Sequence, residues 1–207
     1  MPLIELQFPV LGTEIPADHG YTLYGAISRL VPKLHAHEML LRIGPIRGSY
    51  VGSGKLRLEP GGSRLRVRLQ PDQLPALLPL SGKCLDLAGH AVRLGVPQVS
   101  AIMPGPSLLA RLVTIKGFTE PASFLDAARR QFDALGIRGE LAVPLAPSGQ
   151  HKGQARRRVM RLREKQIVGF ALAVMELNEE DSLKLQEAGL GGRSKMGCGF
   201  FVLTKKG

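Results

Sequence analysis

Five histidines are the side chains of this sequence best suited to proton transfer, and three of them lie near the N-terminus. His35 and His37 are two positions apart, with Glu38 beside them. Because a neutral imidazole near pH 7 can take a proton from a hydroxyl group, both are candidates for a general base. The alternative is that they are ordinary exposed loop histidines. His19 follows Asp18 at a predicted helix start, where a structural role is favoured over a catalytic one.

A second stretch with chemical potential covers residues 189–199, in which five of the eleven residues are glycine. Glycine lets the backbone approach a polyanion closely and expose N–H groups to it. The predicted order is helix, glycine-rich loop, strand, the reverse of nucleotide-binding loops, so a dinucleotide or nucleoside-triphosphate site is not expected. A plain turn after a helix-capping glycine is the alternative. The loop is predicted to contact phosphates through Gly189, Gly191, Gly192, Arg193, Ser194, Lys195, Gly197 and Gly199.

A basic segment upstream of this loop offers further contacts to a polyanion. Adjacent arginines in a strand point to both of its faces, which favours an edge that follows phosphates over a buried stripe. The alternative is a solvated edge strand whose charges block aggregation. The candidate RNA-binding residues here are His151, Lys152, Arg156, Arg157, Arg158, Arg161 and Arg163.

The composition agrees with a basic, globular protein that binds a polyanion. The 207 residues are 44% hydrophobic and carry a formal net charge of +11, which predicts attraction to nucleic acid or to anionic lipid. Aromatic residues make up only 5% and tryptophan is absent, so phosphate contacts are favoured over a broad base-stacking platform.

Several other classes of site and location are not indicated. Cys84 and Cys198 are far apart and form no Cys-x-x-Cys pair, so neither a zinc site nor a disulfide framework is predicted. The histidines have no HExxH spacing and no carboxylate-rich set beside them, so no metal site is expected. No signal-peptide pattern opens the chain, and no apolar run approaches the about 18 residues of a membrane span. We therefore expect a soluble, cytoplasmic protein without a membrane partner.

The elements that must position these residues form two similar halves. In residues 1–103 we predict a strand at 3–10, a helix capped by Asp18 that ends near Pro32, and a strand at 39–46. Residues 55–59 and 63–69 alternate around Pro60 and predict a hairpin with one wet, positive face. That face holds Arg57, Arg64, Arg66 and Arg68. A short helix at 71–78 and two strands at 83–99 complete this half.

The pattern restarts after residues 104–107, the predicted domain boundary. In residues 104–207 we predict a strand at 108–115, a helix at 120–135, strands at 141–143, 156–163 and 167–174, a helix capped by Asn178, and a final strand from Gly199. Both halves follow the order β-α-β-β-α-β. The predicted fold class is therefore α+β, with two tandem ferredoxin-like (RRM-like) domains.

The residues that carry chemistry also carry a family resemblance. Residues 182–200 read SLKLQEAGLGGRSKMGCGF, which resembles the signature loop of the CRISPR repeat-processing endoribonucleases, the Cas-six family. The segments DHGYTLY at 18–24 and VTIKG at 113–117 are most similar to a compact subgroup of that family. The resemblance spans essentially the whole chain, and the C-terminal loop is its most specific part.

The resemblance implies cofactor-free, metal-independent cleavage of the repeat in precursor CRISPR RNA. A substrate 2′-hydroxyl attacks the adjacent phosphate and leaves a 2′,3′-cyclic phosphate and a 5′-hydroxyl, and the enzyme stays on the crRNA and joins other effector subunits. The family's general base is a histidine in or just after the first helix, which implies His35, with His37 second. The family varies in its second catalytic group, so Tyr21, Lys33 and Lys55 stay open.

Two other classes of function remain. A non-catalytic RNA-binding subunit of a CRISPR ribonucleoprotein would keep the glycine-rich loop and the basic surface without needing any histidine. A DNA-binding or membrane-surface protein would need a recognition helix or a basic amphipathic helix, and neither is evident among the predicted helices.

Overall fold

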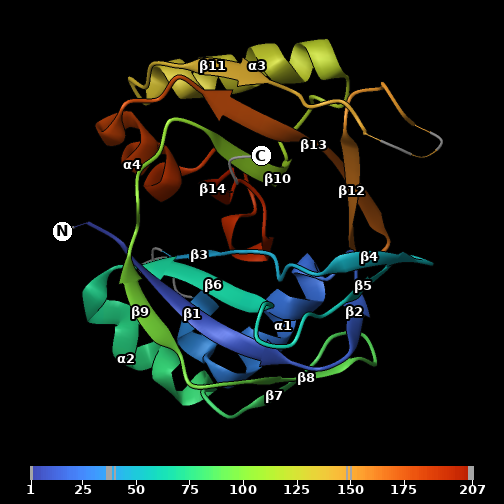
Figure 1. The fold of residues 1–207 in the computed structure, drawn as a ribbon, viewed down its shortest axis with the longest axis vertical. Coiled ribbons are helices and arrows are strands. Elements are labelled where there is room, and N and C mark those ends of the chain that lie inside the picture. Colours follow the sequence, from blue (N-terminus) through green and yellow to red (C-terminus); the bar gives the residue numbers. More distant parts are fainter. Residues whose placement is uncertain (1, 36–38, 40, 148, 150, 205–207) are drawn as a thin grey trace. The chain divides into compact units, whose positions relative to one another are not determined.

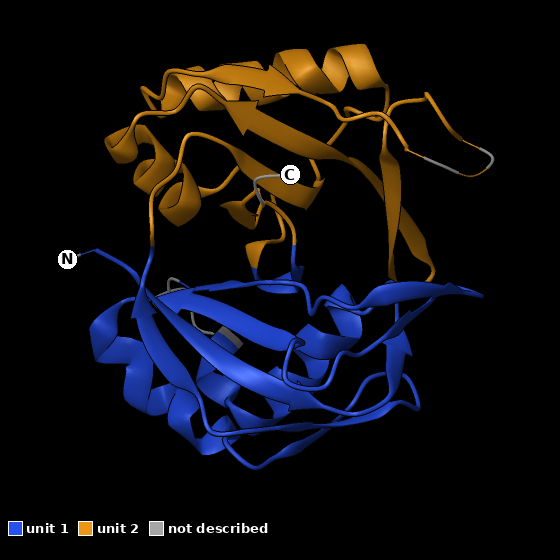
Figure 2. Cartoon of the chain, in the orientation of Figure 1, with its two compact units in different colours: residues 1–102, 195–197 blue, residues 103–194, 198–207 orange. Residues whose placement is uncertain are grey.

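The computed structural model describes residues 2–35, 39, 41–147, 149 and 151–204. Two units, coloured separately in Figure 2, divide the chain. Unit 1 comprises Met1–Ile102 together with Lys195–Gly197, and unit 2 comprises Met103–Ser194 together with Cys198–Gly207. A short piece of the glycine-rich loop therefore belongs by its contacts to unit 1, although its neighbours in sequence belong to unit 2.

Unit 1 is built on an antiparallel sheet with the order β3-β6-β1-β8-β7, in which β9 also pairs with β1 (Figure 1). These strands are β1 Ile4–Leu11, β3 Leu41–Ile43, β6 Arg64–Leu69, β7 Cys84–Asp86, β8 Ala91–Leu94 and β9 Gln98–Ala101. A smaller sheet, in the order β2-β5-β4, joins β2 Glu14–Pro16, β5 Lys55–Arg57 and β4 Ser49–Gly52. The helical segments are α1 Gly20–Leu30, η1 Pro32–His35, η2 Pro71–Gln73, α2 Leu74–Leu77 and η3 Leu78–Leu80.

Alternation along the central strands separates an apolar face from a polar one. In β1 the side chains of Leu6 and Phe8 are fully buried, and in β6 Leu65 is fully buried opposite Phe8. Successive residues of a strand point to opposite faces, so the residues between these apolar positions share the other face. The apolar face forms one core with Leu23 and Ile27 of α1.

The predicted hairpin of residues 55–59 with 63–69 is wrong. In β5, Leu56 pairs with Ile15 of β2 and with Tyr50 of β4. β6 pairs instead with β1 and β3, and Leu65 lies opposite Phe8 of β1. Alternation is the same whichever strand is the neighbour, so it does not choose the partner. Pairing with β1 places the apolar residues of both strands in one core, and this burial sets the register.

Unit 2 is built on a sheet in the order β11-β13-β10-β14, with β12 paired to β13. Its strands are β10 Leu108–Val113, β11 Glu140–Ala142, β12 Arg157–Leu162, β13 Lys165–Met175 and β14 Phe201–Leu203, and its helices are α3 Pro121–Ala134 and α4 Glu179–Ala188. Phenylalanines fill the core: the rings of Phe124 on α3 and Phe170 on β13 lie 4.8 Å apart between centroids, and Phe132 and Phe201 are also fully buried. Tilted aromatic pairs at this distance stabilise a core beyond their buried area.

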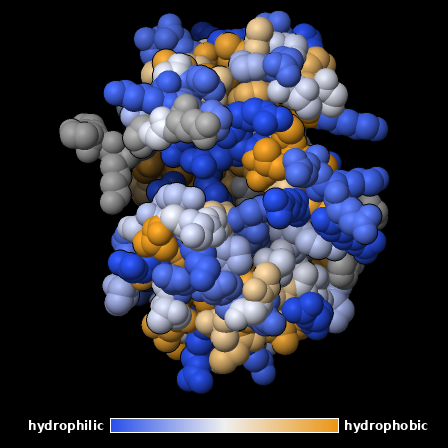
Figure 3. All heavy atoms as spheres, turned by 90° about the vertical axis from the view of Figure 1, so that its right-hand side faces the viewer, coloured by the Kyte–Doolittle hydropathy of each residue, from blue (hydrophilic) through white to orange (hydrophobic). Residues whose placement is uncertain are grey.

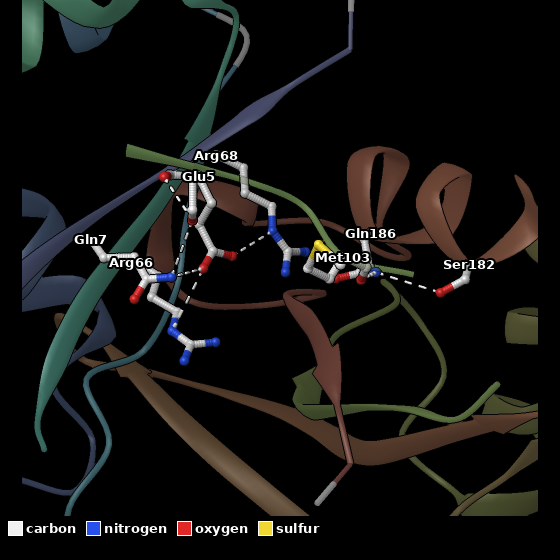
Figure 4. A network of polar contacts seen from close by, with 8 residues as sticks. Glu5, Gln7, Arg66, Arg68, Met103, Ser182 and Gln186 are labelled. Carbon is white, nitrogen blue, oxygen red and sulfur yellow. Dashed lines mark hydrogen bonds and ion pairs between the residues drawn. The ribbon is translucent and has the colours of Figure 1, made fainter. Parts of the chain in front are cut away.

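The start of α4 confirms the predicted cap. Asn178 is the N-cap residue, and its side-chain oxygen accepts a hydrogen bond from the Asp181 amide at 2.8 Å. Two buried polar side chains of the same helix bind the segment that opens unit 2 (Figure 4). Ser182 accepts from the Gly105 amide at 3.0 Å, and Gln186 donates to Met103 O at 2.9 Å. These bonds hold the beginning of the unit against its second helix.

Both units have the ferredoxin-like arrangement, as predicted from the sequence. In unit 1, β1 lies between β6 and the pair β8 and β9, and in unit 2, β10 lies between β13 and β14. In each unit one helix follows the first strand and another precedes the last strands of the sheet. Within the part of the chain that the structure describes, no helix is both long and apolar enough to cross a membrane.

Candidate nucleic-acid interface and active site

The first histidine candidate ends a short helical turn. α1 is followed by η1, a 3-10 turn whose last residue is His35. The Leu34 amide donates to Val31 O at 2.9 Å, and the Leu34 side chain is fully buried. The backbone that leads to His35 is therefore anchored at the residue immediately before it. His37 lies outside the described residues.

His19 is buried at the N-terminus of α1, where it is the N-cap residue in place of the predicted Asp18. Its ring Nδ1 lies 2.8 Å from Pro16 O, and its Nε2 accepts a hydrogen bond from the Ile46 amide at 3.0 Å. Because Nε2 accepts, the proton of the neutral ring is on Nδ1, which donates to Pro16 O. Both ring nitrogens of His19 are thus bound to backbone groups. Of the two roles considered for His19, structural and catalytic, this arrangement suits the structural one. Tyr21 is half-buried in the first turn of α1.

The glycine-rich loop follows α4 in a series of left-handed backbone conformations. Positive φ angles occur at Gly189, Gly191, Arg193, Gly197 and Gly199. Its amides donate within unit 2: Gly191 N to Gln131 Oε1 at 2.8 Å, Gly192 N to Thr114 O at 3.0 Å and Gly199 N to Leu112 O at 2.8 Å. These bonds attach the loop to α3 and to the end of β10, so these amides have protein acceptors.

Close packing explains why two of the loop positions are glycine. A Cβ atom on Gly191 would lie 2.5 Å from Thr114 O, and one on Gly199 would overlap the carbonyl oxygen of Leu190. Real Cβ atoms do not approach that closely. Gly192 differs, because a Cβ there would meet no other heavy atom within 4 Å. Gly191 and Gly199 therefore let the loop backbone pack against its neighbours, a role that the sequence analysis did not assign to them.

The two cations of the loop also bind groups of the protein. Arg193 donates from Nη1 to Thr114 Oγ1 at 3.3 Å within unit 2. Lys195, which belongs to unit 1, donates from Nζ to Leu34 O at 2.6 Å. Burial lowers the pKa of this ammonium group below its ordinary value. Ser194, between the two, is half-buried.

The basic segment forms one strand of a two-stranded extension of the unit 2 sheet. β13 pairs with β10 from Phe170 to Val174, whereas its first part, from Lys165 to Phe170, pairs with β12. We call residues 157–170 of these two strands the basic ribbon. The side chains of Arg157 and Arg161 are exposed, on the same face of β12 and four residues apart. Their alternation with Arg158, which is half-buried, confirms that the arginines divide between two faces.

The other candidates of this segment lie around the basic ribbon. Arg163, in the turn between β12 and β13, is exposed and has a left-handed φ of 54°, and Arg156 is half-buried before β12. His151 and Lys152 are exposed in the preceding loop, where His151 Nδ1 lies 3.1 Å from Gln154 Oε1. Figure 3 views the side on which β12 is labelled in Figure 1, and hydrophilic side chains cover much of it.

The polar face of the unit 1 sheet holds a cluster that the sequence analysis explained by alternation alone. Glu5 accepts from Arg68 Nε at 3.0 Å and from Gln7 Nε2 at 2.7 Å, and Arg66 Nε lies 3.7 Å from its carboxylate (Figure 4). Arg42 of β3 is the register partner of Arg68. Only 1% of the Arg68 surface is exposed, so the prediction that this face is wet is wrong at its centre. The sequence signal for this cluster was Arg42, a charged residue within the apolar run at 39–46.

Positive charge is concentrated on this face. The pKa of Arg42 is lowered to about 10, chiefly by burial and secondly by the positive charge of Arg68. The pKa of Arg47 is lowered by burial and by Arg66, while Glu5 partly offsets this. Guanidinium groups that are poorly solvated and close to one another attract an anion more strongly than solvated ones do. Within the described ranges, no group of three or more His, Cys, Asp or Glu residues could hold a metal ion.

Comparison with known proteins gives a consistent set of similarities. A family model described as "Cas6 Crispr" matches residues 4–206. The curated protein "CRISPR-associated endonuclease Cas6" of Myxococcus xanthus is 40% identical over 202 residues, which cover 98% of this chain and 82% of that protein.

Solved structures show the same fold at low sequence identity. A structure described as "Characterization of a Cas6-related gene from Pyrococcus furiosus" has a TM-score of 0.68 and 11% identity, and the match covers 99% of this chain and 100% of that one. A structure described as "An RAMP protein binding different RNA substrates" has a TM-score of 0.67 and 13% identity, with the same coverage. These similarities support the fold, while the 40% identical relative also carries an activity in its name.

Proposed function

The chain belongs to the Cas6 family, and we propose that it is an endoribonuclease that cuts CRISPR repeat RNA to give mature crRNA. The observation that carries this proposal is the 40% identity, across 98% of the chain, to a protein named as a CRISPR-associated endonuclease. The structural neighbour that is described as binding different RNA substrates, with its matching fold, adds support for RNA as the ligand. The net charge of +11 suits a polyanionic substrate.

The proposed chemistry needs a base and no metal-bound hydroxide. Neutral His35 takes the proton of the substrate 2′-hydroxyl, and the 2′-oxygen then bonds to the adjacent phosphorus. The bond from phosphorus to the 5′-oxygen breaks, which leaves a 2′,3′-cyclic phosphate on one product. The departing 5′-oxygen takes a proton, from solvent or from an acid such as Tyr21, and becomes the 5′-hydroxyl of the other. The position of His35 at the end of η1, directly after α1, supports this assignment.

Incubating the protein with a repeat RNA in excess EDTA tests this function. We expect one cut per repeat, at a rate that EDTA does not change, because the proposed base is an imidazole. The downstream product should accept phosphate from a polynucleotide kinase, and a 2′-deoxy substitution at the cut site should abolish cleavage without abolishing binding. Rescue of an EDTA-inhibited reaction by Mg²⁺ would refute metal independence. Binding without any cut would favour the non-catalytic RNA-binding subunit.

We propose that the basic ribbon contacts RNA phosphates. This proposal is supported by the exposure of Arg157 and Arg161 on one face of β12, which pairs with the part of β13 that extends beyond β10. Arg156, Arg158, Arg163, His151, Lys152 and the loop residue Arg193 are further phosphate contacts in this proposal. Such contacts position an RNA without reading its sequence.

Replacing Arg157 and Arg161 together with alanine should weaken RNA binding and reduce its salt dependence. Each lost phosphate contact lowers the slope of log Kd against log salt by roughly one, so the expected change is about two. The matched control replaces Lys83 and Arg93, two exposed cations of unit 1, and removes the same charge. Filter binding over a range of salt concentrations gives both slopes. Equal slopes in the two double variants would mean that net charge alone acts.

We also propose that the enzyme keeps the crRNA after the cut and passes it to other CRISPR effector subunits in the cytoplasm. The resemblance of residues 182–200 to the family's signature loop supports this partner assignment. Product release measured after a single turnover tests the first part.

A further inference from the structure

A contact across the chain joins the glycine-rich loop to the turn that carries His35. Lys195 Nζ donates to Leu34 O at 2.6 Å, although 161 positions separate the two residues in sequence. Leu34 is fully buried and is followed directly by His35, the last residue of η1. Both Lys195 and Leu34 belong to unit 1. Through Lys195 the loop therefore contacts η1, the segment that ends at the predicted general base His35.

The charged donor makes this contact a strong hydrogen bond. The donor is an ammonium group and the acceptor a backbone carbonyl, and hydrogen bonds from charged donors are shorter and stronger than neutral ones. Burial removes part of the hydration of this ammonium group and so lowers the pKa of Lys195.

The same loop piece also lies beside Pro45. Gly197 has a left-handed φ of 82°, and a Cβ atom there would lie 3.6 Å from the ring carbon Cβ of Pro45. The next residue, Ile46, donates its amide to the buried His19 ring. Residues 195–197 are thus bonded to η1 through Lys195 and lie beside Pro45 at Gly197, all within unit 1.

We propose that Lys195 is a positioning residue, whose ammonium group holds the η1 turn so that His35 is placed for catalysis. This inference rests on the proposed endoribonuclease function. The sequence pattern assigned Lys195 to an RNA phosphate, and the two roles differ in what they predict. A phosphate contact contributes to affinity and to the salt slope, whereas a tether of the η1 turn contributes to the rate of the bound complex.

The test replaces Lys195 with methionine, which keeps most of the aliphatic stem and removes the donor. We expect single-turnover cleavage at saturating RNA to slow by about 10- to 100-fold, as for other displacements of a catalytic group. The Kd for RNA and its salt slope should stay within about twofold of the wild type. Lys195→Arg, which restores a charged donor, should recover most of the rate. Arg193→Met is the matched control, because it removes a cation of the same loop and should act on affinity instead.

Hydrogen exchange of the Leu34 amide provides a readout that does not depend on cleavage. Lys195→Met should raise its exchange rate about tenfold, while amides of α3 exchange as before. A lower affinity and salt slope with an unchanged rate at saturation would overturn the proposal in favour of a phosphate contact. Unchanged exchange would overturn the tether itself. If the wild-type protein cuts no repeat RNA but the exchange result holds, the proposed function fails and the tether stands.

Discussion

Replacing His35 with alanine should slow single-turnover cleavage of a repeat RNA by about 10²- to 10⁴-fold, the usual contribution of one positioned acid–base group. The RNA affinity should barely change, because the imidazole acts on a proton and not on the bulk of the phosphate charge. The wild-type rate should rise with pH between about pH 5 and 8, since only the neutral imidazole accepts a proton. Quenched-flow cleavage with excess enzyme measures the rate, and filter binding measures the affinity.

His37→Ala is the necessary control, since the two histidines are only two positions apart. We expect it to cleave within a few-fold of the wild type if His35 is the base. The reverse ranking, in which His37→Ala is the slow variant, would move the base to His37. Wild-type rates in both single variants and in the double variant would remove the histidines from the mechanism.

The order of elements was predictable because its signals are local. Asn178 with the acids after it predicted the start of α4, and the apolar spacing of residues 120–135 predicted α3. These signals depend on hydrogen bonds and side-chain periodicity within a few residues. The ferredoxin-like order of both units followed from them.

The partners of strands and side chains were not predictable in the same way. Alternation in β5 and β6 was recognised, but their pairing was wrong, because the burial of Leu65 against Phe8 depends on a strand far away in sequence. The cluster of Glu5 with Arg66 and Arg68 has the same origin. No local pattern contains the information about which strand lies next to which.

In the candidate site too, local features were predictable and contacts between distant residues were not. The types and spacing of His35 and His37 predicted a base, and this assignment stays a prediction. The contact between Lys195 and Leu34 could not be predicted, because it joins residues 161 positions apart. The sequence also does not distinguish a loop glycine that exposes its amide from one that avoids a clash. Only the packing of the loop against the end of β10 and against its own backbone makes that distinction.

The close packing of the loop glycines predicts a second large effect, on the stability of the protein. Gly199→Ala should lower the free energy of unfolding by about 2–4 kcal/mol, because the new methyl group would overlap Leu190 O and the φ of 63° disfavours any L side chain. Relaxing this overlap would also disturb the bond from the Gly199 amide to Leu112 O. Urea denaturation followed by circular dichroism measures the change.

Gly192→Ala is the matched control in the same loop. Its Cβ would meet no other heavy atom within 4 Å and its φ is not positive, so the free energy of unfolding should stay within about 0.5 kcal/mol of the wild type. A loop whose glycines served only to expose amides to phosphates would give the opposite result, with both variants stable and both weak in RNA binding. A stable Gly199→Ala protein would mean that Gly199 does not pack against the Leu190 carbonyl as described. A loss confined to Gly199→Ala would show that this glycine first builds the loop, so that Arg193 and Lys195 have fixed places from which to act.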